Sequence, residues 1–292
     1  MEKVAVIGAG TMGNGIAHVF AQSGYSVKLI DVSTEQLDKA IKTIGRNLQR
    51  QQDKGLITAQ EAEAVIQKIR TESDLPTGVS DAELVVEAAT ENLTLKTAIF
   101  QQIDQHAPAG CILATNTSSI SITKLAAATR RPDRVIGMHF MNPVPVMKLV
   151  EVIQGFATDP EVVRTIETLS RDLGKVPCTV KDYPGFIANR ILMPMINEAI
   201  HSLFQGVAGI SEIDTIMKLG MAHPMGPLQL ADFIGLDVCL AILRVMQEGF
   251  GEPKYAPCPL LVNMVNAGKL GVKSGEGFYR YEPGKKESIP AF

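Results

Sequence analysis

The stretch from Val4 to Asp31 constrains the fold of this chain more than any other. A short apolar run, Val4–Ile7, leads directly into the turn Gly8–Gly13, and apolar residues then recur at helical spacing. A second apolar run, Val27–Ile30, ends in Asp31. The order of strand, glycine turn, helix, strand and acidic residue is typical of a dinucleotide-binding βαβ unit. An ordinary βαβ turn that binds no ligand is the structural alternative.

Each glycine of the turn Gly8-Ala9-Gly10-Thr11-Met12-Gly13 has a mechanical role in this interpretation. Gly8 permits the tight turn, Gly10 lets backbone N–H groups approach a pyrophosphate, and Gly13 lets the helix pack closely on the sheet. The helix N-terminus then faces the phosphates, where its partial positive charge favours an anion. The turn therefore predicts five cofactor-binding residues, namely Gly8, Gly10, Thr11, Met12 and Gly13.

Asp31 predicts which dinucleotide is bound. It lies eighteen residues beyond Gly13, at the end of the second apolar run. A carboxylate at this place can accept hydrogen bonds from the adenosine ribose, and it repels a 2′-phosphate. The sequence therefore predicts NAD as the cofactor and disfavours NADP.

Composition limits the classes of function that remain. The 292 residues suffice for about two domains, and the contents of 46% hydrophobic and 20% charged residues are typical of a soluble globular protein. The net charge of −3 argues against general binding to nucleic acid or anionic membranes, and no apolar run is long enough to span a bilayer. The first strand begins soon after Met1, which leaves no room for a targeting peptide. We therefore expect a cytoplasmic protein with neither nucleic-acid nor membrane partners.

The four cysteines indicate neither a metal site nor a disulfide framework. They are widely spaced, form no CxxC pair and lie in apolar or loop contexts. We expect reduced structural thiols and no bound metal.

A helical hairpin is predicted for residues 34–69, after the second strand, with a turn at Gly55. Basic residues recur every four positions on its first helix and should form a ridge along one face. A solvated helix surface is the ordinary explanation for such a row, and a binding site for an anionic substrate group is the alternative. We call Lys42, Arg46, Arg50 and Lys54 the basic ridge.

Polar residues follow three later strands of the predicted sheet. Glu91 comes after Leu84–Val86, Asn116 and Ser118 come after residues 111–114, and His139 ends the next strand. Because ligands bind beyond the carboxyl ends of strands in open α/β sheets, we expect these side chains to line one cleft.

The composition changes at Tyr183-Pro184-Gly185, beyond which no strand pattern is visible. Long apolar helices are expected at 186–204, near 211, at 227–249 and at 259–268. The sequence thus predicts a Rossmann-type domain of mostly parallel sheet with an inserted helical hairpin at 1–183, an all-α domain at 184–282, and a tail at 283–292.

Among the five histidines, His139 is the candidate general base. Glu151 returns on the following strand, and a carboxylate bonded to one ring nitrogen fixes the tautomer and favours the imidazolium. The other nitrogen can then accept a proton from an alcohol. A structural ion pair is the alternative for these two residues.

Five motifs together resemble the L-3-hydroxyacyl-CoA dehydrogenases, and most closely the short bacterial branch that acts on 3-hydroxybutyryl-CoA. The resemblance covers residues 1 to about 282 in the family's order. The motifs are Asn116–Ser119, Gly137–Pro143, Leu149–Val152, Pro184–Arg190 and His223–Pro227.

The resemblance implies an NAD-dependent oxidoreductase that interconverts an L-3-hydroxyacyl-CoA, such as 3-hydroxybutyryl-CoA, and a 3-ketoacyl-CoA such as acetoacetyl-CoA. It implies catalytic roles for His139 as base, Glu151 as its orienting partner, and Ser118 and Asn189 as hydrogen-bonding groups at the substrate. It also implies a homodimer through the helical domain. The implied NAD contacts, with Asn116 added from its strand end, are Asp31, Glu91, Lys96, Asn116, Asn142 and Lys273.

An acyl-CoA substrate gives the basic ridge a function, because coenzyme A carries phosphates far from the reacting carbon. Arg50 and Lys54, nearest the hairpin turn, are the predicted contacts. Three alternatives remain open: a sugar-acid dehydrogenase of the same superfamily, a β-hydroxyacid dehydrogenase with a catalytic lysine, and a non-catalytic NADH-binding or structural relative. The resemblance implies a step that is used in butyrate or polyhydroxyalkanoate metabolism, in fatty-acid β-oxidation and in aromatic-ring degradation.

Overall fold

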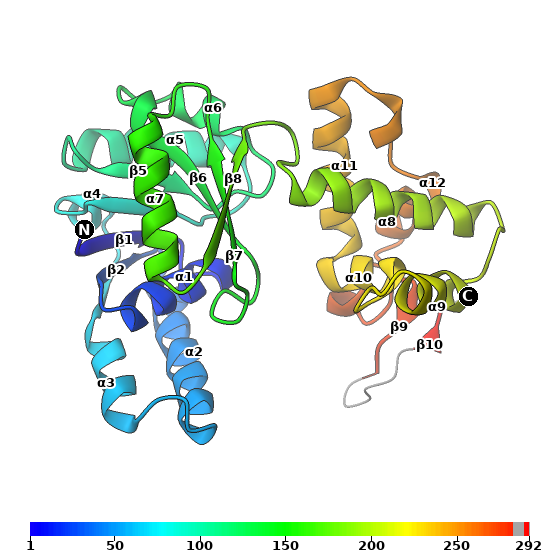
Figure 1. Ribbon diagram of the computed structural model, residues 1–292, viewed down its shortest axis with the longest axis horizontal. Coiled ribbons are helices and arrows are strands. Elements are labelled where there is room, and N and C mark those ends of the chain that lie inside the picture. Colours follow the sequence, from blue (N-terminus) through cyan, green and yellow to red (C-terminus); the bar gives the residue numbers. More distant parts are fainter. Residues whose placement is uncertain (283–288, 292) are drawn as a thin grey trace. The chain divides into compact units, whose positions relative to one another are not determined.

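The apolar runs of the N-terminal half form one eight-stranded sheet in the computed structural model (Figure 1). The structure describes residues 1–282 and 289–291. The chain divides into two compact units, Met1–Tyr183 and Pro184–Phe292. Each unit is described separately below.

The strands of the first unit lie in the order β3-β2-β1-β4-β5-β6-β7-β8. Neighbouring strands are parallel throughout, except for the antiparallel pair β6 and β7. The order reverses between β1 and β4, which is where such sheets bind ligands. The predicted Rossmann-type fold is confirmed. The strands are β1 Lys3–Ile7, β2 Ser26–Ile30, β3 Ile69–Glu72, β4 Leu84–Glu87, β5 Ile112–Thr115, β6 Val135–Phe140, β7 Leu149–Gln154 and β8 Val176–Lys181.

Helices cover both faces of this sheet (Figure 1). Residues of β4, β5 and β6 are buried on both faces, as expected for strands inside a mostly parallel sheet. Phe20 of α1 and Ile166 of α7 pack with Val6 and Val86 in one core layer. The helices are α1 Thr11–Gln22, α4 Leu75–Val79, α5 Leu93–His106, α6 Ile122–Ala126 and α7 Pro160–Asp172, with the 3-10 turn η1 Pro132–Arg134.

The predicted helical hairpin consists of α2 Thr34–Asp53 and α3 Ala59–Gln67, which lie side by side (Figure 1). The Ser33 hydroxyl accepts the Gln36 N–H and caps α2, and Thr58 with Glu61 forms a capping box on α3. The predicted extension of the second helix to Ile69 is wrong, because β3 begins there. This edge strand escaped prediction since its sequence, IRTE, is largely polar and exposed.

The second unit is mainly helical, as predicted. The single helix expected at 227–249 is wrong, because Gly235 with φ +103° separates two helices. The expectation of no strand is also wrong, since β9 and β10 form a short antiparallel pair. Residues 283–288 and 292 of the predicted tail lie outside the described residues. The elements are α8 Ala188–Phe204, α9 Ile210–Gly220, α10 Pro227–Ile234, α11 Leu236–Phe250, η2 Pro253–Tyr255, α12 Pro259–Asn266, η3 Val272–Ser274, β9 Tyr279–Arg280 and β10 Ile289–Pro290.

The second unit has its own apolar core. Met193, Leu243 and Met246 are fully buried there. Among the helices of the described residues, none combines the length and apolar character needed to cross a membrane.

Candidate active site

The glycine turn after β1 has the geometry that a dinucleotide requires. Gly8 has φ +96°, and a Cβ on it would lie 2.7 Å from the Ala88 carbonyl oxygen. A Cβ on Gly13 would lie 1.7 Å from the Gly8 carbonyl oxygen, so only glycine permits this approach of helix and turn. A Cβ on Gly10 would meet no atom within 4 Å. Gly10 is the N-cap residue of α1, and no side chain there caps the N–H groups of the helix. The turn therefore fits a pyrophosphate at the helix N-terminus.

The Asp31 carboxylate lies beside this turn, at the end of β2. Its Oδ2 accepts the Ala9 N–H at 2.8 Å, and its Oδ1 accepts the Ser33 N–H at 2.9 Å. These two bonds hold the carboxylate at the sheet edge where the ribose of a dinucleotide binds in such folds. The residues present thus fit NAD.

A pocket of about 290 Å³ continues from the glycine turn along α2. Its walls come from the start of α1, from α2 and from the loop after β6. The polar side chains that line it include Thr11, Asn14, Gln36, Lys39, Thr43, Asn47 and Asn142.

A buried lysine, Lys175, binds the backbone of the loop that carries Asn142. The Lys175 ammonium donates to the carbonyl oxygens of Val144, at 2.5 Å, and Met147, at 2.8 Å. Burial lowers the pKa of Lys175. Sequence reasoning missed this residue, because nothing local distinguishes it from a surface lysine.

His139 and Glu151 form a buried pair at the carboxyl end of β6. The antiparallel register places them directly opposite each other, and His139 Nδ1 lies 2.8 Å from Glu151 Oε2. Their exposed fractions are 9% and 3%. We assign the Nδ1 proton to the bond with the carboxylate, which leaves proton exchange with a substrate to Nε2.

Two other polar side chains near the sheet have structural roles. The Asn116 side-chain oxygen accepts the Phe140 N–H at 2.9 Å and so joins the ends of β5 and β6. His18 is fully buried in α1, and burial lowers its pKa to about 4, so it is a neutral packing residue at neutral pH.

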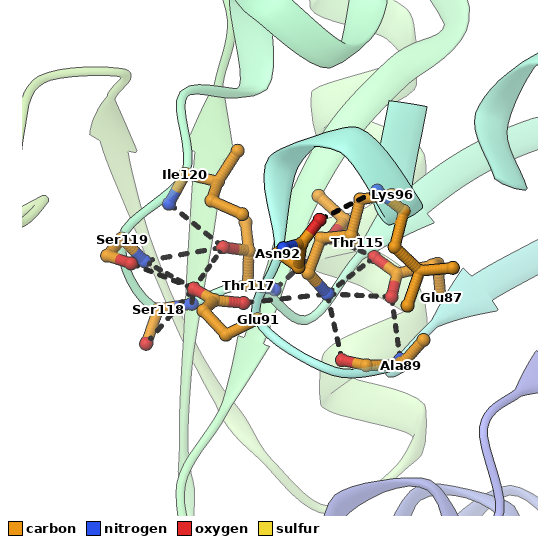
Figure 2. Close-up of polar contacts among 11 residues, drawn as sticks. Glu87, Ala89, Glu91, Asn92, Lys96, Thr115, Thr117, Ser118, Ser119 and Ile120 are labelled. Atoms are coloured by element: carbon orange, nitrogen blue, oxygen red, sulfur yellow. Dashed lines mark hydrogen bonds and ion pairs between the residues drawn. The ribbon is translucent and has the colours of Figure 1, made fainter. Parts of the chain in front are cut away.

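Ser118 lies in a turn that is organised by Glu91 (Figure 2). Glu91 Oε1 accepts the Thr117 hydroxyl at 2.6 Å and the N–H groups of Ser118 and Ser119 at 3.0 and 3.1 Å. Burial by itself raises the pKa of Glu91, but these bonds and the Lys96 charge outweigh it, so that the pKa lies below its usual value. Glu91 therefore carries its charge at neutral pH.

Behind Glu91 lies a second, fully buried ion pair of Lys96 and Glu87. The Lys96 ammonium lies 2.7 and 2.9 Å from the two Glu87 oxygens and 3.1 Å from the Ala89 carbonyl oxygen (Figure 2). Sequence reasoning missed Glu87. Its signal was a carboxylate directly after the apolar run Leu84–Val86. The NAD contact implied for Lys96 stays a prediction.

Asn189 and Lys273 belong to the second unit. Asn189 is 9% exposed, in the first turn of α8. The Lys273 ammonium forms an ion pair of 2.5 Å with Asp237. Their implied roles at substrate and cofactor stay predictions.

The basic ridge is exposed, as expected for a row of charges on a helix. All four of its side chains lie on α2 or at its C-terminal cap. Within the described residues, no ion pair with a carboxylate involves any of the four. Arg46 donates to the Thr43 hydroxyl at 3.1 Å, next to the pocket along α2.

Comparison with known proteins gives matches along nearly the whole chain. Residues 3–183 match the domain described as 3-hydroxyacyl-CoA dehydrogenase, NAD binding domain, and residues 185–281 match the C-terminal domain of the same enzymes. A probable 3-hydroxybutyryl-CoA dehydrogenase of Bacillus subtilis is 51% identical over 97% of this chain and 98% of its own length. The corresponding protein of Deinococcus radiodurans is 53% identical over 96% of this chain and 100% of its own.

A solved structure agrees with these sequence matches. The crystal structure of (S)-3-hydroxybutyryl-CoA dehydrogenase PaaH1 from Ralstonia eutropha superposes with a TM-score of 0.94 at 48% identity. The alignment covers 97% of this chain and 99% of the other. With both domain matches in sequence order, a dinucleotide turn and a relative of 51% identity, the chain belongs to the 3-hydroxyacyl-CoA dehydrogenase family, and its N-terminal unit is an NAD-binding domain.

Proposed function

We propose that this protein is an NAD-dependent dehydrogenase that interconverts L-3-hydroxybutyryl-CoA and acetoacetyl-CoA. The buried pair of His139 and Glu151, at a strand end of the NAD-binding unit, carries the proposal. A relative at 51% identity over almost the full length, named a probable 3-hydroxybutyryl-CoA dehydrogenase, supports the short-chain substrate.

In the proposed mechanism, the protein supplies proton transfer and charge stabilisation. When bound, NAD supplies the hydride acceptor. His139 takes the proton of the 3-hydroxyl on Nε2 as that oxygen becomes a ketone, and the Glu151 carboxylate stabilises the resulting imidazolium. Ser118 holds the same oxygen by a hydrogen bond, and Asn189 of the helical unit adds a second one. In the reverse direction, protonated His139 returns the proton to the ketone oxygen.

The setting of this reaction is part of the proposal. We place it in the cytoplasm and in butyrate or fatty-acid metabolism. The four cysteines are free thiols, which fits a reducing compartment.

Oxidation of NADH by the purified protein with acetoacetyl-CoA tests the proposed function. We expect turnover with acetoacetyl-CoA and none with a panel of keto sugar acids. Turnover of a sugar acid alone would favour the related sugar-acid dehydrogenases, and no turnover of any substrate would indicate a non-catalytic relative.

The basic ridge is proposed to hold the nucleotide end of coenzyme A. It runs along α2 beside the pocket that begins at the glycine turn, and its cations are exposed. Removing Arg50 and Lys54 together should raise KM modestly, because exposed charge pairs contribute about 0.2–1 kcal/mol each. The effect should shrink with added salt, while kcat stays unchanged.

The comparison uses Arg50→Ala/Lys54→Ala with acetoacetyl-CoA and with an acetoacetyl thioester that lacks the nucleotide. Lys68→Ala, an exposed cation beyond the end of α3, is the control. We expect a loss of efficiency with the CoA substrate only. An equal loss with both substrates, or no loss, would mean that the ridge is a solvated helix face.

A homodimer through the helical unit completes the proposal. An apolar hollow of about 360 Å³ is lined by Met195, Val207, Ile213, Ile216 and Met217. On the same two helices, α8 and α9, Ile191 and Leu219 are 67% and 80% exposed. Such a surface usually marks an interface. Five apolar residues of α8 suggest this interface from the sequence: Ile191, Leu192, Met195, Ile196 and Leu203. Ile191 is exposed and Met195 lines the hollow, whereas Leu192 and Leu203 are partly buried against the core of the unit and Ile196 lies within it.

Light scattering at micromolar concentration should give the mass of a dimer. Ile216→Glu should lower that mass to a monomer's, since a buried unpaired charge disfavours association. The exposed Val32→Glu, in the first unit, is the control. A stable active monomer of the unaltered chain would contradict the dimer.

A further inference from the structure

A row of three charged side chains lies behind the Ser118 turn. Glu87 at the end of β4 is 0% exposed, and Lys96 of α5 is 1% exposed. The third charged side chain is Glu91, whose Oε2 lies 3.5 Å from the Lys96 ammonium. An ammonium has three donors, and Glu87 and Ala89 take them at 3.1 Å or less. Lys96 is therefore committed to protein oxygens.

Glu91 transmits this arrangement to the turn. One of its oxygens receives backbone N–H bonds from Ser118 and Ser119 and also lies within 3.3 Å of both serine hydroxyls. The orientation of the Ser118 backbone and hydroxyl thus depends on where the Glu91 carboxylate is held.

Glu87 also reaches the turn from the strand side (Figure 2). The Thr115 hydroxyl donates to Glu87 Oε2 at 2.6 Å and accepts the Thr117 N–H at 3.2 Å. One buried carboxylate therefore fixes both sides of the turn, through Lys96 and Glu91 on one side and through Thr115 and Thr117 on the other.

We propose that Glu87 is a positioning residue for the reaction, which with Lys96 holds Glu91 and the Ser118 turn in the geometry that serves the substrate oxygen. The proposal rests on the proposed function, in which Ser118 bonds that oxygen. It assigns Lys96 a role through its neighbours.

The charge of Glu87 is essential to this arrangement. In Glu87→Gln, the buried Lys96 ammonium keeps its charge but loses its carboxylate, and an unpaired buried charge is costly. The nearest remaining anion is Glu91. Lys96 should then draw that carboxylate inward and away from Ser118. Removing the lysine charge as well, in Glu87→Gln/Lys96→Met, should let Glu91 return to the turn.

The experiment measures kcat and KM for acetoacetyl-CoA in both variants. Glu87→Gln should lower kcat about 10- to 100-fold, as expected for a displaced hydrogen-bonding group, with a smaller change in KM. The double variant should recover about half of that loss on a logarithmic scale. Asp104→Asn is the matched control. Asp104 is a buried carboxylate on α5, the helix that carries Lys96, and it pairs with Arg131 at 2.8 Å but makes no bond to the Ser118 turn. This variant should lower the melting temperature but leave kcat within about twofold.

Hydrogen exchange of the Ser118 and Ser119 amides provides a second readout that needs no turnover. Protection should fall in Glu87→Gln and stay unchanged in Asp104→Asn. Thr115→Val keeps both charges and loosens only the strand side, so it tests the proposal if Glu87→Gln does not fold. It should lower both kcat and protection.

Three results would overturn the proposal: unchanged kcat and protection in Glu87→Gln, equal losses of kcat in Glu87→Gln and Asp104→Asn, or no recovery in the double variant. A wild-type protein inactive on acetoacetyl-CoA would instead refute the proposed function. The exchange measurement would still decide whether Glu87 positions the turn.

Discussion

His139→Gln should lower kcat for acetoacetyl-CoA reduction by about 10²- to 10⁴-fold, the usual contribution of a positioned general acid or base. Glutamine has a similar size but cannot take up a proton. Binding of NADH should be unchanged, because the glycine turn and Asp31 lie on other strands of the sheet.

The control for this result is His106→Gln, at the exposed end of α5, which should leave kcat at the wild-type value. Glu151→Gln should give an intermediate loss, because it weakens the bond to Nδ1 without removing the ring. Wild-type turnover in His139→Gln would refute the assigned mechanism, since no proton carrier would then be missing.

Asp31→Ser should reverse much of the preference for NADH over NADPH. The carboxylate repels a 2′-phosphate. The next two residues are Val32 and Ser33, so no arginine directly after Asp31 is available to bind that phosphate. The variant should also bind NADH about 10- to 100-fold more weakly, because it loses the carboxylate that accepts hydrogen bonds from the adenosine ribose, and such charge-assisted bonds contribute about 1.5–3 kcal/mol. The specificity constants for the two cofactors measure the change.

Asp31→Asn separates the two effects, because its amide oxygen can keep one backbone bond while the charge is lost. It should gain activity with NADPH and lose less affinity for NADH than the serine variant. Asp38→Asn, an exposed carboxylate of α2, is the control. A wild-type protein that prefers NADPH, or an Asn variant with an unchanged cofactor ratio, would contradict the role of the charge.

Local patterns explain how much of the fold could be predicted. The glycine turn, the buried strands and the caps of the hairpin depend on neighbours within a few residues, so the sequence carries their signal directly. The edge strand Ile69–Glu72 carries no such signal, because its pairing with β2 comes from the sheet. Gly235 likewise gives no clear signal, because a single glycine can also lie within a helix; its φ of +103° in the structure is what separates α10 from α11.

The candidate site shows the same division. His139 and Glu151 could be paired from sequence, because successive antiparallel strands bring residues of one register together. The partners of Lys175 and Glu87 could not be predicted from sequence. The sequence around a lysine or a glutamate does not tell whether its side chain is buried or exposed.

By itself, then, the sequence determined the strand–glycine turn–helix–strand unit, the acidic residue Asp31 at its end and the pair His139 and Glu151. Only the tertiary structure decided which charges are enclosed and what holds the Ser118 turn. The physical reason is that burial arises from packing between distant segments: β4, α5 and the end of β5 together exclude water from Glu87 and Lys96, and none of these segments excludes it alone.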